Sequence, residues 1–125
     1  MKLICYLSNG FPTLEQSARL AEYYAQGGCD IIEIDLPSRN PYLESEFIAN
    51  RMATALKACD DYDRYMDNIL EIRRRLPNTK LLILSYGNTV EEIGVEKYAK
   101  FCVDNDMRDI IFVGLENEEI KNELI

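Results

Sequence analysis

The sequence predicts an α/β fold around a parallel sheet, in one domain of residues 1–125. Four short aliphatic runs alternate with longer segments of helical pattern, and parallel strands require such crossover helices between them. The last two aliphatic runs are almost wholly apolar, which is typical of strands that are covered on both faces. A chain of 125 residues can bury roughly two-thirds of its unfolded surface, so a stable core is expected.

The first βα unit combines a strand at residues 2–8 with a helix. Asn9-Gly10 is a turn signal that ends the strand. Thr13, followed three residues later by Gln16, forms a capping box that starts the helix. Apolar residues then recur at helical spacing as far as Gly27-Gly28, where the helix stops. These apolar positions are Leu14, Ala18, Ala21 and Ala25.

The second unit opens with a strand at residues 30–37 and continues through two helices. The first of these helices is expected from about residue 44 to residue 57. Asp60 or Asp61 caps the second one, which ends before Pro77. Its apolar stripe consists of Tyr65, Ile69, Ile72 and Leu76.

The third unit begins with a strand at residues 80–86. Gly87-Asn88 is predicted to be the turn after it. Thr89 and Glu92 make a second capping box, which starts one helix. The inner face of that helix carries Tyr98, Phe101 and Cys102.

The fourth unit consists of a strand at residues 109–114 and a helix that begins at residues 117–125 and is incomplete there. The chain therefore supplies four βα units. A closed barrel of this kind has eight units and typically ~250 residues.

Charge and hydropathy exclude several classes of function. The net charge of −8 argues against nucleic acid, because nucleic-acid binding depends on basic surfaces that neutralise phosphates. No apolar run approaches the ~20 residues that span a bilayer. The apolar run at residues 3–7 is too short for a signal peptide. We expect a cytoplasmic protein that is not attached to a membrane.

The residue types present exclude further chemistry. The chain contains no His, which removes the Ser-His-Asp triad and His-based metal sites. The four Cys residues lie far apart with no Cys-x-x-Cys pair, so free thiols fit better than disulfides or zinc. No glycine-rich phosphate loop is present. We therefore expect neither a metal nor an organic cofactor.

The second strand carries the most informative candidate site. Ligands of α/β proteins bind at the carboxyl ends of the strands. Because side chains alternate along a strand, Glu33 and Asp35 share one face with Ile31. The opposite face is aliphatic and suits packing against helices; it carries Ile32, Ile34 and Leu36.

Two interpretations of this acidic pair are equally consistent with the spacing. Burial and mutual repulsion raise the pKa of a carboxyl group, which makes it a proton carrier near neutral pH. Alternatively, Glu33 and Asp35 form buried ion pairs with Lys2 or Lys80 on neighbouring strands, or both are wetted in an open site.

Other candidate residues follow the strands. By pattern, Glu44 and Glu46 are acids at the start of a helix, where the helix dipole favours them. Tyr6 and Tyr86 lie on the first and third strands and could flank an aromatic ligand. Aromatic residues in strands more often belong to the core, so both interpretations stay open.

Several segments match one known family in order and in spacing. The clearest match runs from Leu14 through Gly27 to Pro37. The others are residues 69–73, 83–88, 94–98 and 109–113. These segments resemble the alpha chain of tryptophan synthase, in which a helix ends in Ala-Gly-Ala-Asp and the next strand reads Glu-Leu-Gly-x-Pro-Phe-Ser-Asp-Pro. The resemblance implies the N-terminal, parallel (βα)4 half of a TIM (β/α)8 barrel of the ribulose-phosphate-binding type.

The resemblance also implies a carbon–carbon lyase of tryptophan biosynthesis that uses no organic cofactor. Such a lyase cleaves indole-3-glycerol phosphate to indole and glyceraldehyde 3-phosphate by a retro-aldol reaction. The proton-transferring glutamate falls on Glu33, and the carboxylate that acts on the indole nitrogen falls on Glu44. Substrate-binding positions fall on Tyr6, Tyr86 and Asn88. A tryptophan synthase beta chain is the partner that the resemblance implies.

The sequence departs from the family pattern at several positions. Asp35 stands where the family has glycine and adds a charge beside the substrate. Residues 38–45 differ from the family loop Phe-Ser-Asp-Pro-Leu-Ala-Asp-Gly, and Leu115 stands where the family has an aspartate. The family's N-terminal helix, strands 5 to 8 and phosphate-binding loops have no counterpart in residues 1–125.

Three alternatives fit the same pattern of elements. The chain could be a barrel lyase that acts on another phosphorylated substrate. It could be a non-catalytic binding or assembly module, in which two copies close an eight-stranded barrel as a homodimer through their unpaired edges. A compact flavodoxin-like monomer is a third possibility for the same elements, and a solution mass measurement would separate it from the dimer.

Overall fold

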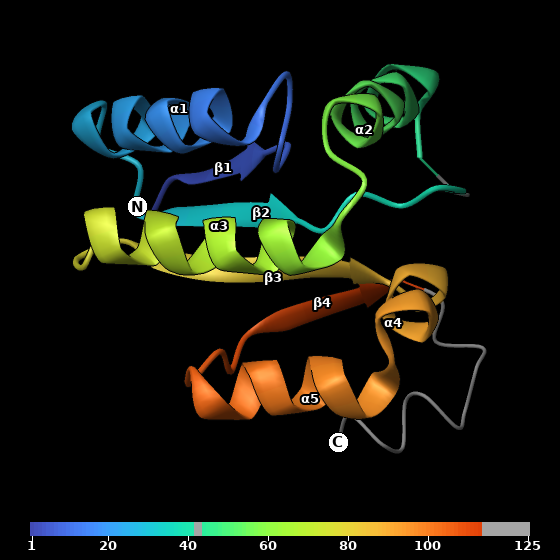
Figure 1. The fold of residues 1–125 in the computed structure, drawn as a ribbon. Coiled ribbons are helices and arrows are strands. Elements are labelled where there is room, and N and C mark those ends of the chain that lie inside the picture. The colour runs from blue at the N-terminus through green and yellow to red at the C-terminus, as the bar shows by residue number, and fades with distance from the viewer. Residues whose placement is uncertain (42–43, 114–125) are drawn as a thin grey trace.

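The computed structural model describes residues 1–41 and 44–113, which form four strands and five helices (Figure 1). In chain order these are β1 (Ile4–Leu7), α1 (Leu14–Gln26), β2 (Ile31–Asp35), α2 (Glu46–Ala58), α3 (Tyr62–Arg75), β3 (Lys80–Tyr86), α4 (Gly87–Ile93), α5 (Val95–Asp104) and β4 (Ile110–Val113). The helix expected at residues 117–125 and the position of Leu115 lie outside the described residues.

The four strands form one parallel sheet in the order β1-β2-β3-β4. Tyr6 is opposite Glu33, and Glu33 is opposite Leu82. This sequential order confirms the predicted parallel sheet. It excludes the flavodoxin-like alternative, in which the second strand lies outside the first and the order reverses there.

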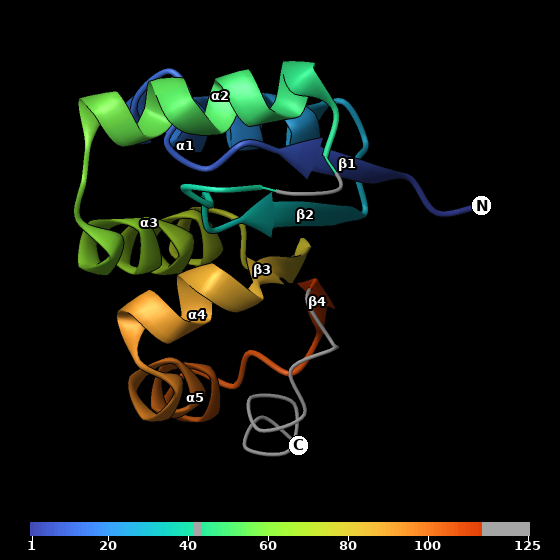
Figure 2. The ribbon, with the colours of Figure 1, turned by 90° about the vertical axis from the view of Figure 1, so that its right-hand side faces the viewer.

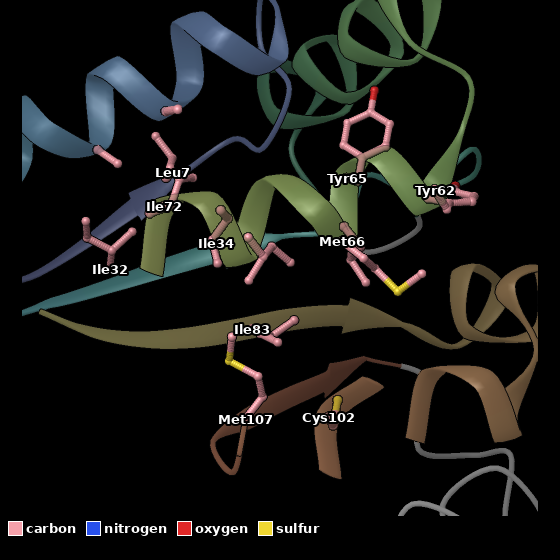
Figure 3. Close-up of a cluster of buried hydrophobic side chains, with 14 of the residues drawn as sticks. Leu7, Ile32, Ile34, Tyr62, Tyr65, Met66, Ile72, Ile83, Cys102 and Met107 are labelled. Atoms are coloured by element: carbon pink, nitrogen blue, oxygen red, sulfur yellow. The ribbon is translucent and has the colours of Figure 1, made fainter. Parts of the chain in front are cut away.

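Helices α1, α3 and α5 cover one face of the sheet, which we call the outer face (Figure 2). Ile32 and Ile34 of β2 are fully buried beneath them, as predicted from the alternation. The core also includes Leu7, Ile69, Ile72, Ile83, Tyr98 and Cys102, several of which appear in Figure 3. Burial of these apolar side chains is the main stabilising contribution, at roughly 1.5–3 kcal/mol for each fully buried Leu or Ile.

Most helix starts agree with the predicted caps. The Thr13 side chain accepts a hydrogen bond from the backbone N–H of Gln16 at 3.2 Å. Of the two candidate aspartates, Asp61 caps α3. Helix α2 begins at Glu46 rather than at residue 44, because Ser45 is its cap. Glu44 therefore precedes the helix, and the prediction that the helix begins at residue 44 is wrong.

The prediction for residues 87–104 was wrong in two respects. Gly87 and Asn88 do not form a turn; they are the first residues of α4, which follows β3 directly. Thr89 is buried inside α4 and caps nothing. The single expected helix is two helices, because Gly94 has a φ of 106° that an α-helix cannot contain.

Helix α2 lies near the carboxyl ends of the strands (Figure 1), and its Ala55 contributes to the main core. Its Met52 packs against Leu84 and Tyr86 of β3, on the face opposite the main core. We call this second face of the sheet the inner face. The Tyr65 hydroxyl of α3 donates to the Ala55 carbonyl at 2.8 Å and so fixes α2.

Candidate active site

A small cavity opens on the inner face at the carboxyl ends of the strands. It has a volume of about 140 Å³ and is lined by Tyr6, Glu33, Glu44, Ile48 and Leu84. Tyr6 and Glu33 are neighbours in the β1–β2 register, whereas Glu44 comes from the loop before α2. The structure therefore brings together both predicted catalytic acids and one predicted substrate-binding residue.

Glu33 lies half-buried in the middle of β2. Burial raises the pKa of its carboxyl group, and the charge of Glu44 raises it further. Within residues 1–41 and 44–113, no lysine or arginine forms an ion pair with Glu33 or Asp35, and Lys80 pairs instead with Asp109 at 3.0 Å. The predicted alternative of an ion pair with Lys2 or Lys80 is therefore wrong. An acid without a cation partner, and with a raised pKa, is suited to proton transfer.

Asp35 lies behind the cavity and is fully buried. Its two carboxyl oxygens accept one hydrogen bond each, from the Tyr6 hydroxyl and from the backbone N–H of Asn9, the latter at 3.0 Å. Burial raises the pKa of Asp35 to about 7, although both hydrogen bonds oppose the shift. Burial and the charge of Asp35 also raise the pKa of Tyr6, so this tyrosine keeps its proton.

Glu44 and Tyr86 form a second tyrosine–carboxylate pair. The Tyr86 hydroxyl donates to Glu44 Oε1 at 2.5 Å. Tyr86 is fully buried at the end of β3, and burial followed by this hydrogen bond raises its pKa. The hydrogen bond places the Glu44 carboxylate at the cavity, although Glu44 comes from a loop.

Asn88 does not line the cavity with the other predicted residues. Its Oδ1 accepts from the Ser38 hydroxyl and from the backbone N–H of Thr89, both at 3.0 Å. Its Nδ2 donates to the Asn40 carbonyl at 3.3 Å. Asn88 therefore joins the loop after β2 to the start of α4, and its role in substrate binding stays a prediction.

The sequence pattern did not predict the buried polar network behind Asp35. Asn68 of α3 donates to Asn9 Oδ1 at 2.9 Å, and Asn9 donates to the Tyr65 carbonyl at 3.2 Å. Asn68 also donates to Ser17 of α1 at 3.3 Å. A signal was present, because Asn68 is a polar residue within the apolar stripe of α3. The network anchors the turn after β1, and with it the Asn9 N–H that contacts Asp35.

Gly10 shows why this turn requires glycine. Its φ is 83°, and a Cβ atom at this position would come within 2.3 Å of the Tyr65 ring. Any other residue would be strained there and would displace Tyr65.

A larger hollow, of about 790 Å³, lies at the opposite end of the sheet, near the start of β3 and β4. Its cationic side chains already have partners: Arg73 donates to the Asn105 carbonyl, and Arg108 pairs with Asp106. Ligands of parallel α/β sheets bind at the carboxyl ends of the strands. The smaller cavity is therefore the better candidate site.

The four Cys residues are free. In the part of the chain that the structure describes, no group of three or more acidic, Cys or His side chains could hold a metal ion. None of the helices in that part is long and apolar enough to cross a bilayer.

Comparison with known proteins yields a consistent set of relatives. A family model described as tryptophan synthase alpha chain matches residues 1–124. The tryptophan synthase alpha chain of Methanosarcina barkeri is 30% identical over 117 residues, and that of Zymomonas mobilis is 29% identical over 117 residues. Each alignment covers 94% of this chain and 43% of the relative. The chain thus spans less than half the length of these curated relatives.

Solved structures show the same relation in three dimensions. Tryptophan synthase subunit alpha from Legionella pneumophila superposes with a TM-score of 0.86 at 23% identity. Tryptophan synthase from M. tuberculosis superposes with a TM-score of 0.83 at 24% identity. Each match covers 98% of this chain and 48% of the other. The likeness confirms the predicted fold, a (βα)4 half of a TIM barrel.

Proposed function

Because the chain belongs to the tryptophan synthase alpha chain family, we propose that its inner face is the catalytic half of a carbon–carbon lyase site. The proposed reaction is retro-aldol cleavage of indole-3-glycerol phosphate to indole and glyceraldehyde 3-phosphate. One observation supports it most directly: Glu33 and Glu44 line a single cavity at the carboxyl ends of the strands.

Each acid suits one part of this chemistry. Breaking the carbon–carbon bond requires protonation of indole C3 and loss of the proton on the adjacent glycerol hydroxyl. Glu33 is assigned to proton transfer, because a carboxyl group with a raised pKa holds a proton nearer to neutral pH. Protonation at C3 leaves positive charge on the ring nitrogen, and the Glu44 carboxylate is assigned to stabilise that charge. Tyr6 is assigned to border the indole ring.

The test of this function is Glu33→Gln, assayed by indole release from indole-3-glycerol phosphate. Since the chain spans less than half of its relatives, the assay uses a fusion to the second half of the Methanosarcina barkeri alpha chain. We expect the rate to fall by roughly 10²–10⁴-fold, the usual contribution of a general acid. Glu46→Gln is the matched control, because Glu46 is exposed in the first turn of α2. Undiminished turnover in Glu33→Gln, or an inactive unmodified fusion, would contradict the assignment.

Partners of the proposed enzyme follow from the family. We propose that the substrate phosphate is bound by segments outside residues 1–125 and that a tryptophan synthase beta chain docks at the carboxyl ends of the strands. Titration of the fusion with a beta chain, followed by sedimentation, tests the second point. The cytoplasmic location stays a prediction.

A lyase acting on another phosphorylated substrate is a second candidate, and Asp35 is the observation that favours it. A fully buried carboxyl group behind the cavity makes the site more polar than an indole ring requires. If the natural substrate is indole-3-glycerol phosphate, Asp35→Gly should not increase its cleavage. A large increase would favour the other substrate.

Self-assembly is a third candidate, favoured by apolar side chains at the two edges of the sheet. Leu3, just before β1, is 51% exposed, Ile4 of β1 is 55% exposed, and Ile111 of β4 is 39% exposed. Unpaired strand edges are association sites. Light scattering tests this directly, since a monomer has a mass of 14.5 kDa and a closed homodimer has about twice that.

A further inference from the structure

Two tyrosine–carboxylate pairs flank Glu33, and they differ in which member lines the cavity. In one pair the carboxylate, Glu44, lines the cavity and the tyrosine, Tyr86, is buried behind it. In the other pair the tyrosine, Tyr6, lines the cavity and Asp35 is buried behind it. The second pair therefore presents a hydroxyl group to a ligand, and the direction of its proton decides what that hydroxyl can bind.

The surroundings of Asp35 determine this direction. The backbone N–H of Asn9 donates to Asp35 Oδ1 at 3.0 Å, and the Tyr6 hydroxyl donates to Oδ2. When Asp35 is ionised, its carboxylate can only accept, so Tyr6 is the donor in that state. The Ser8 hydroxyl is buried near the Tyr6 hydroxyl, and its interaction with Tyr6 opposes the rise in the Tyr6 pKa.

We propose that Asp35 is a positioning residue that keeps the Tyr6 proton turned away from the cavity, so that Tyr6 offers an acceptor to a ligand. The ligand group that matches this site carries an N–H or O–H donor. The inference rests on the proposed function only in taking this cavity as the ligand site.

Protonation of Asp35 reverses the direction of its hydrogen bond with Tyr6. A neutral carboxyl group has a proton of its own to donate, and it gives this hydrogen bond to the Tyr6 oxygen. The Tyr6 proton then rotates about the C–O bond and becomes available to Ser8 or to a ligand. Burial raises the pKa of Asp35, so Tyr6 is the donor at pH values above that pKa and the reversed arrangement forms below it.

Several other titratable groups face Asp35 and Tyr6 from neighbouring elements. They are Glu33 of β2, Glu44 of the loop before α2, Tyr65 of α3 and Tyr86 of β3. The tyrosines among them keep their protons, because burial raises the pKa of Tyr65 and Tyr86. The charges of the two glutamates raise the pKa of Asp35, so the test has to observe Asp35 and Tyr6 individually.

The test is carbon NMR of the 125-residue chain, labelled at the aspartate Cγ and the tyrosine Cζ. Asp35→Asn and Tyr6→Phe assign the two resonances. We expect the Tyr6 Cζ resonance to move with pH at the midpoint of the Asp35 titration and to lose this step in Asp35→Asn. Removal of the donor in Tyr6→Phe should raise the Asp35 midpoint by about 1 pH unit, the equivalent of one hydrogen bond to a charged group.

Tyr23→Phe is the matched control, because Tyr23 is 60% exposed on α1, and it should leave the Asp35 midpoint unchanged. The proposal is overturned if Tyr6 does not follow the Asp35 titration, or if Tyr6→Phe leaves the midpoint where it was. The second variant keeps the proposal testable should Asp35→Asn fail to fold. Since no substrate is involved, failure of the lyase assay would leave these resonances as predicted.

Discussion

The outer and inner faces of the sheet differ most clearly along β2, where neighbouring residues point in opposite directions. Ile32 and Ile34 are fully buried beneath the helices of the outer face. Glu33, between them, lines the cavity of the inner face, and Asp35 is buried behind that cavity. One strand therefore supplies hydrophobic burial on one side and titratable groups on the other.

The two faces of the sheet separate stability from chemistry. Aliphatic side chains on the outer face gain free energy from burial without any partner. A carboxyl group on the inner face loses hydration when it is buried, and it is tolerated only with hydrogen bonds or a proton. Changes on the outer face should thus alter stability at every pH, whereas changes at the inner acids should alter its dependence on pH.

Asp35→Asn should produce the largest effect, on the pH dependence of stability. The pKa of Asp35 is about 7 in the folded chain and about 3.9 in an unfolded one. The folded state therefore binds more protons between these values, so the free energy of unfolding decreases as pH rises from about 4 to 7. The decrease is on the order of 4 kcal/mol, and Asp35→Asn should remove it.

Urea unfolding at several pH values measures this slope. Asp67→Asn is the matched control, because Asp67 is exposed on α3, and it should keep the wild-type slope. If the slope is the same in wild type and Asp35→Asn, Asp35 does not carry a raised pKa.

Ile34→Ala and Glu33→Ala compare the two faces at adjacent positions. Ile34 is fully buried in the core, and its truncation should lower the free energy of unfolding by about 3 kcal/mol. Glu33→Ala removes a half-buried acid that has no cation partner among residues 1–41 and 44–113, and it should change stability by less than about 0.5 kcal/mol. Urea unfolding at pH 7 measures both. Equal losses would show that the inner face is as important for stability as the outer one.

Regular periodicity made most of the fold predictable from sequence. The strand at residues 80–86 and the cap Thr13 were predicted at the positions where they occur, and Asp61 is one of the two aspartates predicted to cap α3. The error at Gly87-Asn88 has a physical cause. Gly-Asn is typical of turns, but here Asn88 binds the loop after β2 and α4 begins at once. That tertiary contact is not visible in the local sequence.

The candidate site was predictable only in part. Alternation along β2 placed Glu33 and Asp35 on one face, but it did not reveal that Asp35 binds Tyr6 and lies behind the cavity. The pairing of Glu44 with Tyr86 joins residues 42 positions apart, and no local pattern encodes it. The family resemblance, rather than spacing, singled out Glu44.

Asn88→Ala should have the smallest effect and bears on whether this residue belongs to the inner-face site. If Asn88 serves to join the loop after β2 to α4, loss of its hydrogen bonds to Ser38 and Asn40 should cost about 1 kcal/mol. Asn78→Ala is the control, since Asn78 is exposed in the turn before β3 and should cost less than about 0.5 kcal/mol. Urea unfolding distinguishes the two. An Asn88→Ala variant as stable as Asn78→Ala would mean that these contacts are dispensable and that the Asn88 side chain is free for the substrate contact that the family resemblance implies.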